Sequence, residues 1–453
     1  MMQNTRGHFG SKIGVVLASA GSAVGMGNIW RFPTETAENG GAAFVLIYLI
    51  CVAVVGVPLM VSEFVVGRHT HTNNATAFKK LAPGALWQVE GARGVLVSFL
   101  ITCFYIVISG WTLYYAYASL VGLLSDADRD YDAFFNEFQS NPWQQVICTT
   151  LFLAIVTWII TRGVKSGIER FSKLMMPMLL LIIGVLVVCS FSLPGSSEGM
   201  SYLLHPDFSK LSGTMVLAAF GQAFFSLSLA MGNLSTYASY FRDDTNLNKT
   251  AWSVAIIDTM VALLAGLIIF PAVFSLPNPD PSQSGVGLVF KTLPYVFTQA
   301  FGGISWLGYV FSLLFYLLLF LAALTSAMST HEPVTAWLHE THHISRRRAT
   351  LIVTAVCLFF GIICSLQPSL LHDVPLLSLV SIDSLDTLTS TFMMPIGGIV
   401  ISIFVGWKLD RQLVRDEMTN YGRLRFRLFG VYIFLLRWVI PPSIATVFVL
   451  QFV

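Results

Sequence analysis

The chain has 453 residues, of which 55% are hydrophobic and only 11% are charged, and its net charge is +2. Together with a mean hydropathy of +0.72, this composition excludes a water-soluble globular protein and predicts an all-α membrane protein with one transmembrane domain over residues 1–453. The small net charge gives no indication of nucleic-acid binding.

Runs of roughly 20 apolar residues predict about eleven membrane-spanning helices. Their expected limits are 12–35, 42–67, 91–122, 144–161, 167–192, 213–238, 248–275, 302–338, 349–367, 374–407 and 428–452. The stretch Pro277–Ala300 is too polar to span a membrane, so we expect an outer loop that carries a short helix near Val286–Thr298.

Lysine and arginine predict the orientation, because cytoplasmic loops are enriched in these residues. They gather before span one and after spans two, four, six, eight and ten, whereas the loop after span three is acidic. We therefore expect a multi-pass protein of the cell (inner) membrane with a cytoplasmic N-terminus. Because the number of spans is odd, the C-terminus is expected to lie outside the cytoplasm.

Span one contains residues that a simple membrane anchor would not carry. Residues Ile13–Pro33 read IGVVLASAGSAVGMGNIWRFP, with Gly21, Gly25 and Gly27 shortly before Arg31. Glycine costs about 1 kcal/mol in a helix interior, and an arginine at membrane depth costs at least roughly 2.5 kcal/mol. We therefore expect a broken helix, and irregular backbone at this depth survives only where it is buried in protein or lines a cavity. Such a break points to a transporter's binding site.

Span six repeats this feature. Its segment SLSLAMGN, residues 226–233, shares the sequence Met-Gly-Asn with residues 26–28. Breaks in the first and sixth spans are what a five-plus-five inverted repeat requires. The expected repeats cover about 12–192 and 213–407, and the helix at about 428–452 is an addition to them.

The breaks predict a chemistry as well as a fold. An unwound segment leaves N–H groups that favour a carboxylate and carbonyl groups that favour cations, so two facing breaks suit a zwitterion with a small hard cation. Asp258 in span seven is expected to be a cation ligand or proton carrier, with a protonated structural role as the alternative. The hydroxyls of Thr325 and Ser326 suit Na+, although such hydroxyls usually bond to the carbonyl one turn earlier. Tyr105 and Phe225 are ordinarily packing residues, but the Tyr105 hydroxyl needs a partner.

One motif suggests a different function. Residues 339–343, His-Glu-Thr-His-His, match the H-E-x-x-H signature of zinc proteases. The motif lies where span eight meets the cytoplasm, directly before three arginines, and no third ligand is obvious. We therefore expect neither a catalytic zinc nor an enzyme.

Residues 21–33, GSAVGMGNIWRFP, and 38–44, ENGGAAF, resemble the first-helix signature of the neurotransmitter:sodium symporter family. They are most similar to its bacterial amino-acid transporters, which have the LeuT-type fold. The resemblance continues through FGQAFFSLSL, TYASYFR and LTSAM to RWVIPP in span eleven and so covers essentially the whole chain. It implies symport of an amino acid into the cell with Na+, by alternating access.

The resemblance also implies the site residues. The substrate-binding residues would be Ala23, Gly25, Met26, Gly27, Ile101, Tyr105, Phe225, Ser226, Ser228, Met231, Ser326 and Thr330. One of two Na+ sites would use Ala23, Asn28, Ser226 and Asp258, and the other Gly21, Val24, Ala322, Thr325 and Ser326. An outer gate would pair Arg31 with Asp386, or with Asp383 if the register differs, and an inner gate would pair Arg6 with Glu340 near Tyr240.

Departures from the family pattern refine this expectation. Asp258 stands where many relatives have Asn, and it is the only acid near the place where the animal relatives hold chloride, which predicts chloride independence. Gly25 stands where monoamine transporters carry an acidic residue, which favours a substrate with its own carboxylate. The mostly apolar pocket favours a neutral hydrophobic or aromatic amino acid.

Other functions stay open at this point. They are a passive channel, an intramembrane metalloprotease, a sensor that binds an amino acid without moving it, and a transporter of another small carboxylate-bearing solute. The expected partners are the small-molecule substrate and the lipid bilayer, and the expected state is a monomer or a weak dimer.

Overall fold

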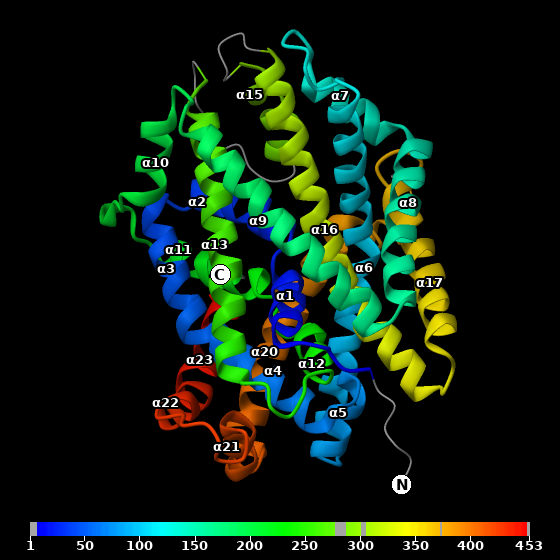
Figure 1. The fold of residues 1–453 in the computed structure, drawn as a ribbon, viewed down its shortest axis with the longest axis vertical. Helices are drawn as coiled ribbons and strands as arrows, with labels where there is room; N and C mark the ends of the chain where they lie inside the picture. Colours follow the sequence, from blue (N-terminus) through cyan, green and yellow to red (C-terminus); the bar gives the residue numbers. More distant parts are fainter. Residues whose placement is uncertain (1–6, 277–286, 300–304, 372–373, 451–453) are drawn as a thin grey trace.

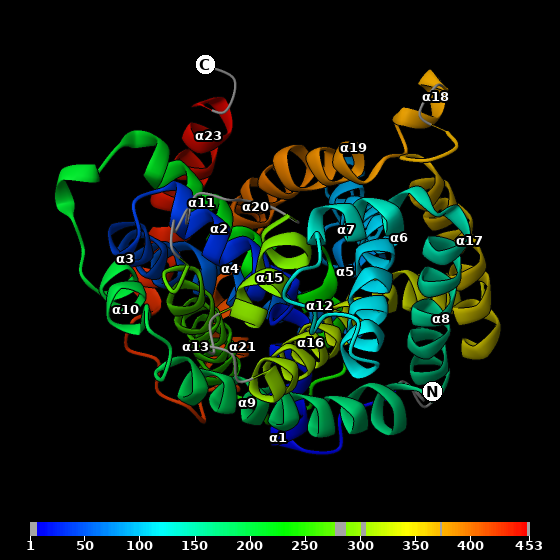
Figure 2. The same ribbon diagram turned by 90° about the horizontal axis from the view of Figure 1, so that it is seen from above.

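The computed structural model describes residues 7–276, 287–299, 305–371 and 374–450, and within these residues it contains helices and no strand. Long helices run between two ends of the molecule (Figure 1). The lower end of Figure 1 carries α5, α21 and α22, and the upper end carries α7, α10 and α15. Seen from above, α8, α9 and α17 lie along the outside (Figure 2), and α1 packs against α9, α13 and α16.

Among the described residues, nine helical stretches are long and apolar enough to cross a membrane, and a tenth crossing is a pair of helices bent by 54°. The nine are Ala42–Thr70, Trp87–Leu120, Pro142–Thr161, Val164–Ser190, Leu247–Val273, Trp306–Thr341, Arg346–Leu366, Ile382–Lys408 and Phe429–Leu450. The bent pair is Lys12–Ala23 with Gly27–Glu38. The expected sixth span is present as two half-helices, α11 (Gly213–Ser226) and α12 (Asn233–Ala238).

Several crossings are built from more than one helical segment, with π-helical turns (η) between or beside α-helical ones. In chain order the segments of the crossings are α1 (Lys12–Ala23), η1 (Gly27–Arg31), α2 (Phe32–Glu38), α3 (Ala42–Cys51), η2 (Val52–Gly56), α4 (Val57–Thr70), α6 (Ala85–Leu120), α8 (Pro142–Thr161), η3 (Val164–Glu169), α9 (Arg170–Ser190), α11, α12, α13 (Leu247–Val273), α16 (Ser305–Thr341), α17 (Arg346–Leu366), α19 (Ile382–Asp386), η6 (Thr387–Met393), α20 (Met394–Ile403), η7 (Phe404–Lys408), α22 (Phe429–Phe434), η8 (Leu435–Val439) and α23 (Ile440–Leu450).

Shorter helices connect the crossings. They are α5 (Asn74–Leu81), α7 (Tyr131–Ser140), α10 (Ser196–Leu204), the 3-10 turn η4 (Phe208–Lys210), η5 (Leu288–Thr292), α15 (Leu293–Gln299), α18 (Pro375–Ser378) and α21 (Arg411–Thr419). Together η5 and α15 form the short outer-loop helix that the sequence predicts, apart from Val286, which lies outside the described residues.

Span ten begins later than predicted. The expected limit is residue 374, but the continuous helix begins at Ile382, after the separate short helix α18. Ser381 is extended and its side chain accepts a hydrogen bond from the Ser384 N–H, which caps the new helix. A polar cap inside an apolar run is easily read as part of the span, which explains the error.

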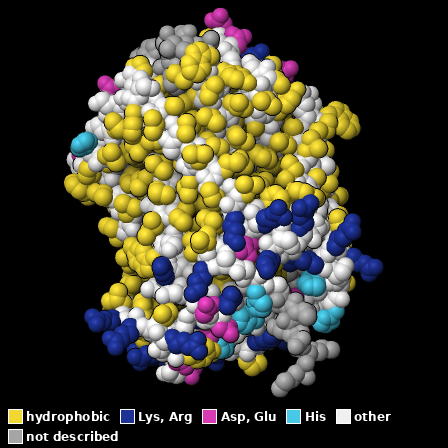
Figure 3. All heavy atoms as spheres, viewed as in Figure 1, with side chains coloured by type: hydrophobic (Ala, Val, Ile, Leu, Met, Phe, Trp, Pro, Cys, Tyr) yellow, Lys and Arg dark blue, Asp and Glu magenta, His cyan; other side chains and the backbone are white. Residues whose placement is uncertain are grey.

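The surface of the molecule separates into two zones. On the face that Figure 3 shows, hydrophobic side chains cover the upper and middle parts, and lysine and arginine side chains gather in the lower part. Many large apolar side chains are exposed in the crossings, including Leu181, Val188 and Trp438. An exposed apolar belt of this kind is stable where it faces lipid and not water.

A buried ion pair fixes α21 against α4 at the lower end. Arg68 Nε lies 2.7 Å from Glu417 Oε2, and both side chains are at most 5% exposed. Arg68 also donates to Asn420 Oδ1 at 2.9 Å and to the carbonyl oxygens of Thr245 and Glu417. His69 Nδ1 lies 3.0 Å from the second oxygen of Glu417. Because these contacts satisfy both charges in several directions, the pair acts as a latch between distant parts of the chain.

Glu417 gives this latch a pH dependence. Burial alone raises its pKa, but the contact with His69 and the charge of Arg68 outweigh burial and hold the pKa below its ordinary value of 4.5. A lowered pKa means that the charged form contributes stability above the pKa of the unfolded chain. That contribution is lost as the pH falls through the pKa of the folded state.

We therefore predict that Glu417→Gln lowers the free energy of unfolding at neutral pH by about 1.5–3 kcal/mol, the range for a hydrogen bond to a charged group. The difference from the unaltered protein should shrink as the pH is lowered below about 4.5, the ordinary pKa of a glutamate. Thermal unfolding of the purified protein between pH 7 and pH 3 measures this. Glu198→Gln, at an exposed position of α10, is the matched control and should show neither effect.

Candidate functional site

The first break separates α1 from η1. The helix ends at Ala23, Val24 takes an extended conformation with ψ 110°, and helical structure resumes at Gly27. The Gly25 N–H donates to Asn28 Oδ1 at 2.9 Å. A Cβ at Gly25 would overlap the hydroxyl of Ser326 and lie 3.2 Å from that of Tyr105, so only glycine fits here. The break therefore brings bare backbone against two hydroxyl groups.

The second break covers residues 227–232 between α11 and α12. Ser228, Ala230 and Gly232 all have positive φ, at 53°, 58° and 77°. A non-glycine residue in this conformation costs roughly 1–2 kcal/mol, so the segment depends on its surroundings. The Ala230 N–H donates to Glu63 Oε1 at 2.7 Å, and Arg93 donates to the Ala230 carbonyl at 2.8 Å. Side chains from α4 and α6 thus take the place of the missing helical hydrogen bonds.

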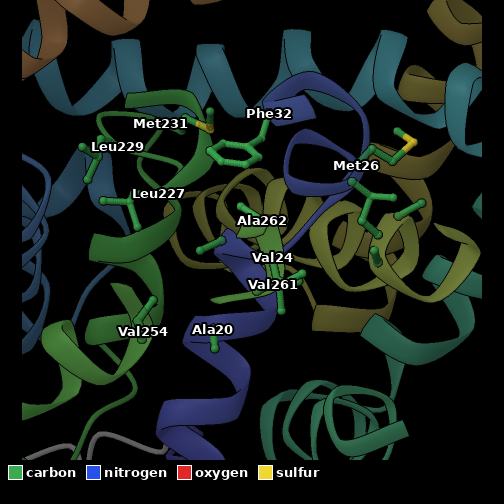
Figure 4. Packing of buried hydrophobic residues seen from close by; sticks show 14 of the residues in the cluster. Ala20, Val24, Met26, Phe32, Leu227, Leu229, Met231, Val254, Val261 and Ala262 are labelled. Atoms are coloured by element: carbon green, nitrogen blue, oxygen red, sulfur yellow. The ribbon is translucent and has the colours of Figure 1, made fainter. Parts of the chain in front are cut away.

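The two breaks lie side by side. Ser228 Oγ donates to the carbonyl of Ser22 at 3.0 Å. In Figure 4, Leu227 and Leu229 of the second break lie across from Val24 of the first, among other buried apolar side chains. Polar backbone from both breaks is therefore enclosed by an apolar wall.

The first predicted cation group is assembled from three different segments. Asn28 Nδ2 donates to Asp258 Oδ1 at 2.7 Å, and Ser226 Oγ donates to Asp258 Oδ2 at 2.6 Å. The hydroxyl of Tyr48 lies 3.4 Å from Ser226 Oγ. Ala23, the remaining member, lines the same cavity as Ser226. Asp258 is completely buried, so a carboxylate and several neutral oxygens meet away from bulk water, a donor set that suits a hard monovalent cation.

The second predicted cation group lies between α1 and α16. Ser326 Oγ donates to the Val24 carbonyl at 3.1 Å, and Thr325 Oγ1 lies 3.5 Å from the same oxygen. Thr325 Oγ1 also lies 3.0 Å from the Ala322 carbonyl, and a Cβ at Gly21 would lie 3.3 Å from the Thr325 side chain. All five predicted residues are thus neighbours. Thr325 makes the ordinary bond to a carbonyl of its own helix, and its role as a Na+ ligand stays a prediction.

A small cavity of about 40 Å³ lies between the breaks. Of the twelve residues predicted to bind substrate, eleven line it: Ala23, Gly25, Gly27, Ile101, Tyr105, Phe225, Ser226, Ser228, Met231, Ser326 and Thr330. Met26 does not line this cavity, although its N–H points to the Tyr105 hydroxyl at 3.5 Å. Ser22 and Phe104 line the cavity without having been predicted.

A larger vestibule of about 420 Å³ lies above this cavity. Gly27, Phe104, Tyr105 and Phe225 line both spaces, so these residues form the partition between them. The guanidinium carbon of Arg31 lies 4.5 Å from the centre of the Phe225 ring. Aromatic rings therefore form the floor of the vestibule, and the guanidinium group of Arg31 lies above the ring of Phe225.

The residues of the predicted outer gate lie around the vestibule. Arg31, Asp383 and Asp386 all line the vestibule. Arg31 Nε lies 3.4 Å from Glu35 Oε1 on the next helical turn, and among the described residues neither Asp383 nor Asp386 lies within ion-pair distance of it. The pairing of Arg31 with either aspartate stays a prediction.

The predicted inner gate is only half described, because Arg6 lies outside the described residues. Glu340 Oε2 accepts hydrogen bonds from the backbone and side-chain nitrogens of Asn73, both at 2.8 Å. The Tyr240 hydroxyl donates to Glu332 Oε1 at 2.6 Å, and Arg346 holds both oxygens of that carboxylate. Tyr240 thus contacts a network that the sequence did not predict.

Sequence reasoning missed the charged residues that support the site. Glu63 and Glu332 are at most 2% exposed, and both occur in apolar runs, VVGVPLMVSEFVVG and LTSAMSTHEPVTAW. The cost of an ionisable residue at membrane depth was the available signal. Arg346, the partner of Glu332, lies at the start of α17, and Arg93, which pairs with Glu90, lies near the start of α6; both resemble ordinary positive-inside residues.

The zinc-protease motif does not lie on one continuous helix. Helix α16 ends at Thr341, and His343 has a left-handed backbone with φ 52°. The two histidines therefore do not lie one turn apart on a helix face, as the signature requires. No group of three metal-ligating side chains lies together in the described part of the chain.

Comparisons with known proteins agree with this geometry. The model of the Sodium:neurotransmitter symporter family matches residues 6–137 and 131–453. YhdH, an uncharacterized sodium-dependent transporter of Bacillus subtilis, is 39% identical over 97% of this chain and 96% of its own length. An uncharacterized sodium-dependent transporter of Methanocaldococcus jannaschii is 32% identical over 97% of this chain and 89% of its own length.

A solved structure gives the same result for the fold. The crystal structure of MhsT in complex with L-phenylalanine matches with a TM-score of 0.88 and 40% identity, covering 98% of this chain and 99% of that chain. The predicted LeuT-type fold with broken first and sixth spans is confirmed by this match and by the two observed breaks. This chain belongs to the sodium:neurotransmitter symporter family and is a sodium-dependent membrane transporter, not an enzyme.

Proposed function

We propose that this symporter carries a neutral amino acid with a hydrophobic or aromatic side chain into the cell, by alternating access and without chloride. The observation that carries the proposal is the cavity between the breaks, where the Tyr105 hydroxyl and backbone groups meet the apolar side chains of Ile101, Phe225 and Met231. A carboxylate would bind the polar end and a hydrophobic side chain the apolar end. The similar MhsT was crystallised with L-phenylalanine, which supports this class of substrate.

The driving force in this proposal comes from two Na+ sites. One would use Ala23, Asn28, Ser226 and Asp258, and the other Gly21, Val24, Ala322, Thr325 and Ser326. Each ion moving through 100 mV contributes about 2.3 kcal/mol, and a tenfold gradient adds about 1.4 kcal/mol per ion. Two ions then supply roughly 7 kcal/mol, which corresponds to about 10^5-fold accumulation of a neutral solute.

Asp258 supports the proposed independence from chloride. Its buried carboxylate lies beside Ser226 and Tyr48 and would supply a negative charge next to the proposed cation. A protein with its own charge in this place needs no added anion. The carboxylate would also be the group that takes up a proton once the cation has left.

The proposed transporter consists of two inverted repeats, about 12–192 and about 213–407, with an extra helix at about 428–452. Arg31 and Asp386 or Asp383 would close the outer side, and Arg6 and Glu340 the inner side. The basic lower end would face the cytoplasm, in the inner membrane of the cell, with the C-terminus outside. A monomer or weak dimer is sufficient, since each chain contains a whole site.

Uptake by the purified protein in liposomes tests the function. We expect labelled hydrophobic or aromatic amino acids to accumulate under an inward Na+ gradient without chloride, and the accumulation to collapse when an ionophore dissipates the gradient. Binding of an amino acid without any accumulation would indicate a sensor. Failure of every amino acid in both assays, with the protein folded, would indicate another carboxylate-bearing solute.

The role of Asp258 gives a second test. We predict that Asp258→Asn reduces chloride-free, Na+-driven uptake about tenfold or more, the effect of losing one charge-assisted interaction, and that added chloride restores part of it. Asp207→Asn, at an exposed loop position, is the matched control and should transport normally. Unchanged chloride-free uptake by Asp258→Asn would refute the role assigned to this carboxylate.

The second cation group gives a third test of the proposed function. Thr325→Val keeps the side-chain volume but removes the hydroxyl, so the Na+ concentration for half-maximal uptake should rise about three- to tenfold. Thr150→Val is the control, because the Thr150 hydroxyl donates to the Val146 carbonyl of its own helix. If both variants show the same Na+ dependence as the unaltered protein, Thr325 is a structural residue only.

A further inference from the structure

The lower end of the last two crossings carries an unusual concentration of positive charge. Six exposed basic side chains lie within twenty residues of sequence: Lys408, Arg411, Arg415, Arg423, Arg425 and Arg427. Among the described residues, none of them lies in an ion pair. Dark-blue side chains gather over α21 and α22 at the lower left of Figure 3.

The acidic residues of the same segment are engaged elsewhere. Asp410 caps α21 by accepting from the Gln412 N–H at 2.9 Å, and Asp416 accepts from the Gln412 side chain at 2.8 Å. Glu417 is held by Arg68. Among the described residues, none of these three carboxylates lies within ion-pair distance of the six basic side chains.

Two of the arginines lie close to the same aromatic ring. The guanidinium carbons of Arg411 and Arg415 lie 5.6 and 5.8 Å from the centre of one ring, that of Phe429. They are one helical turn apart on α21, so both project from the same helix face. The backbone that carries them is held in place, because the latch between Arg68 and Glu417 holds α21 and Phe429 is buried. Two guanidinium groups beside one ring repel each other, and an anion near both of them offsets this repulsion.

An apolar surface begins directly beside this pair. Leu428, Val431, Phe434 and Trp438 are each more than half exposed, and their spacing places them along one side of α22 and η8. Trp438 packs against the half-exposed Trp407, with ring centres 5.0 Å apart. Exposed tryptophans of this kind are typical of the membrane interface. The arrangement is a pair of arginines against one ring, at the edge of a lipid-facing stripe.

We propose that this is a binding site for an anionic phospholipid of the surrounding membrane. The phosphate would lie between Arg411 and Arg415, and an acyl chain would follow the stripe from Leu428 to Trp438. The remaining basic side chains would add electrostatic attraction for the phosphate without defining its position. A loop that merely follows the positive-inside rule needs charge but no such geometry, whereas here two planar guanidinium groups from one helix face lie against the same ring at the start of an apolar track.

Binding of single lipids to the purified, delipidated full-length protein tests the proposal. In native mass spectrometry we expect phosphatidylglycerol to bind more tightly than phosphatidylcholine, with a preference that weakens as salt is added. The double variant Arg411→Gln/Arg415→Gln should weaken phosphatidylglycerol binding about 30-fold and leave phosphatidylcholine binding unchanged. An excess of inorganic phosphate should not displace the lipid, because phosphate lacks the acyl chains.

The matched control is Arg347→Gln/Arg348→Gln, which removes two exposed arginines at the start of α17 and should leave phosphatidylglycerol binding unchanged. An equal loss in the control would show diffuse attraction and overturn the proposal, as would displacement of the lipid by inorganic phosphate. The comparison of the two lipids on the unaltered protein does not depend on any variant folding. Equal binding of both lipids there would also overturn it.

Discussion

The structure depends on one constraint, which is that backbone polar groups at membrane depth must find partners inside the protein. Both breaks release such groups, and both are surrounded by side chains that accept or donate in their place. Glu63 accepts from the N–H of Ala230 and Arg93 donates to its carbonyl, and Asn28 accepts from the N–H of Gly25. Residues of both breaks line the cavity, so the same feature that threatens the stability of the fold brings polar backbone to this cavity.

Polar side chains from separate crossings converge on this cavity because the crossings are packed closely. Gly67 of α4 allows the backbone of α12 to approach so nearly that a Cβ would overlap the Ser235 carbonyl. Ser98 of α6 donates to the Met231 carbonyl at 2.6 Å and to Asn233 at the same distance. The second break is therefore held from two sides by rigid helices. A segment with three left-handed residues keeps one conformation only under such support.

The sequence predicts the fold and the gathering of residues around the breaks well, because its strongest signals are local. Apolar runs define the crossings, and glycines with Asn28 and Arg31 mark the first break, so these features need no knowledge of distant contacts. The supporting residues are a different case, since the role of Glu63 or Glu332 depends on which backbone or arginine lies opposite. The late start of span ten has a similar origin, because the cap formed by Ser381 is invisible to a hydropathy pattern. Pairings across space, such as that of Arg68 with Glu417, are fixed by packing and not by composition.

The partition between vestibule and cavity has a consequence for the rate of transport. It consists of side chains, mainly the rings of Phe104, Tyr105 and Phe225, and the same residues line the spaces above and below. A layer one side chain thick opens by rotation about a few bonds, which takes picoseconds to nanoseconds for an unconstrained side chain, whereas collective helix movements take microseconds to milliseconds. Access from the vestibule is therefore a side-chain step that needs no movement of whole helices. Because Phe104 and Tyr105 are buried, the packing around these rings sets the rate of this step.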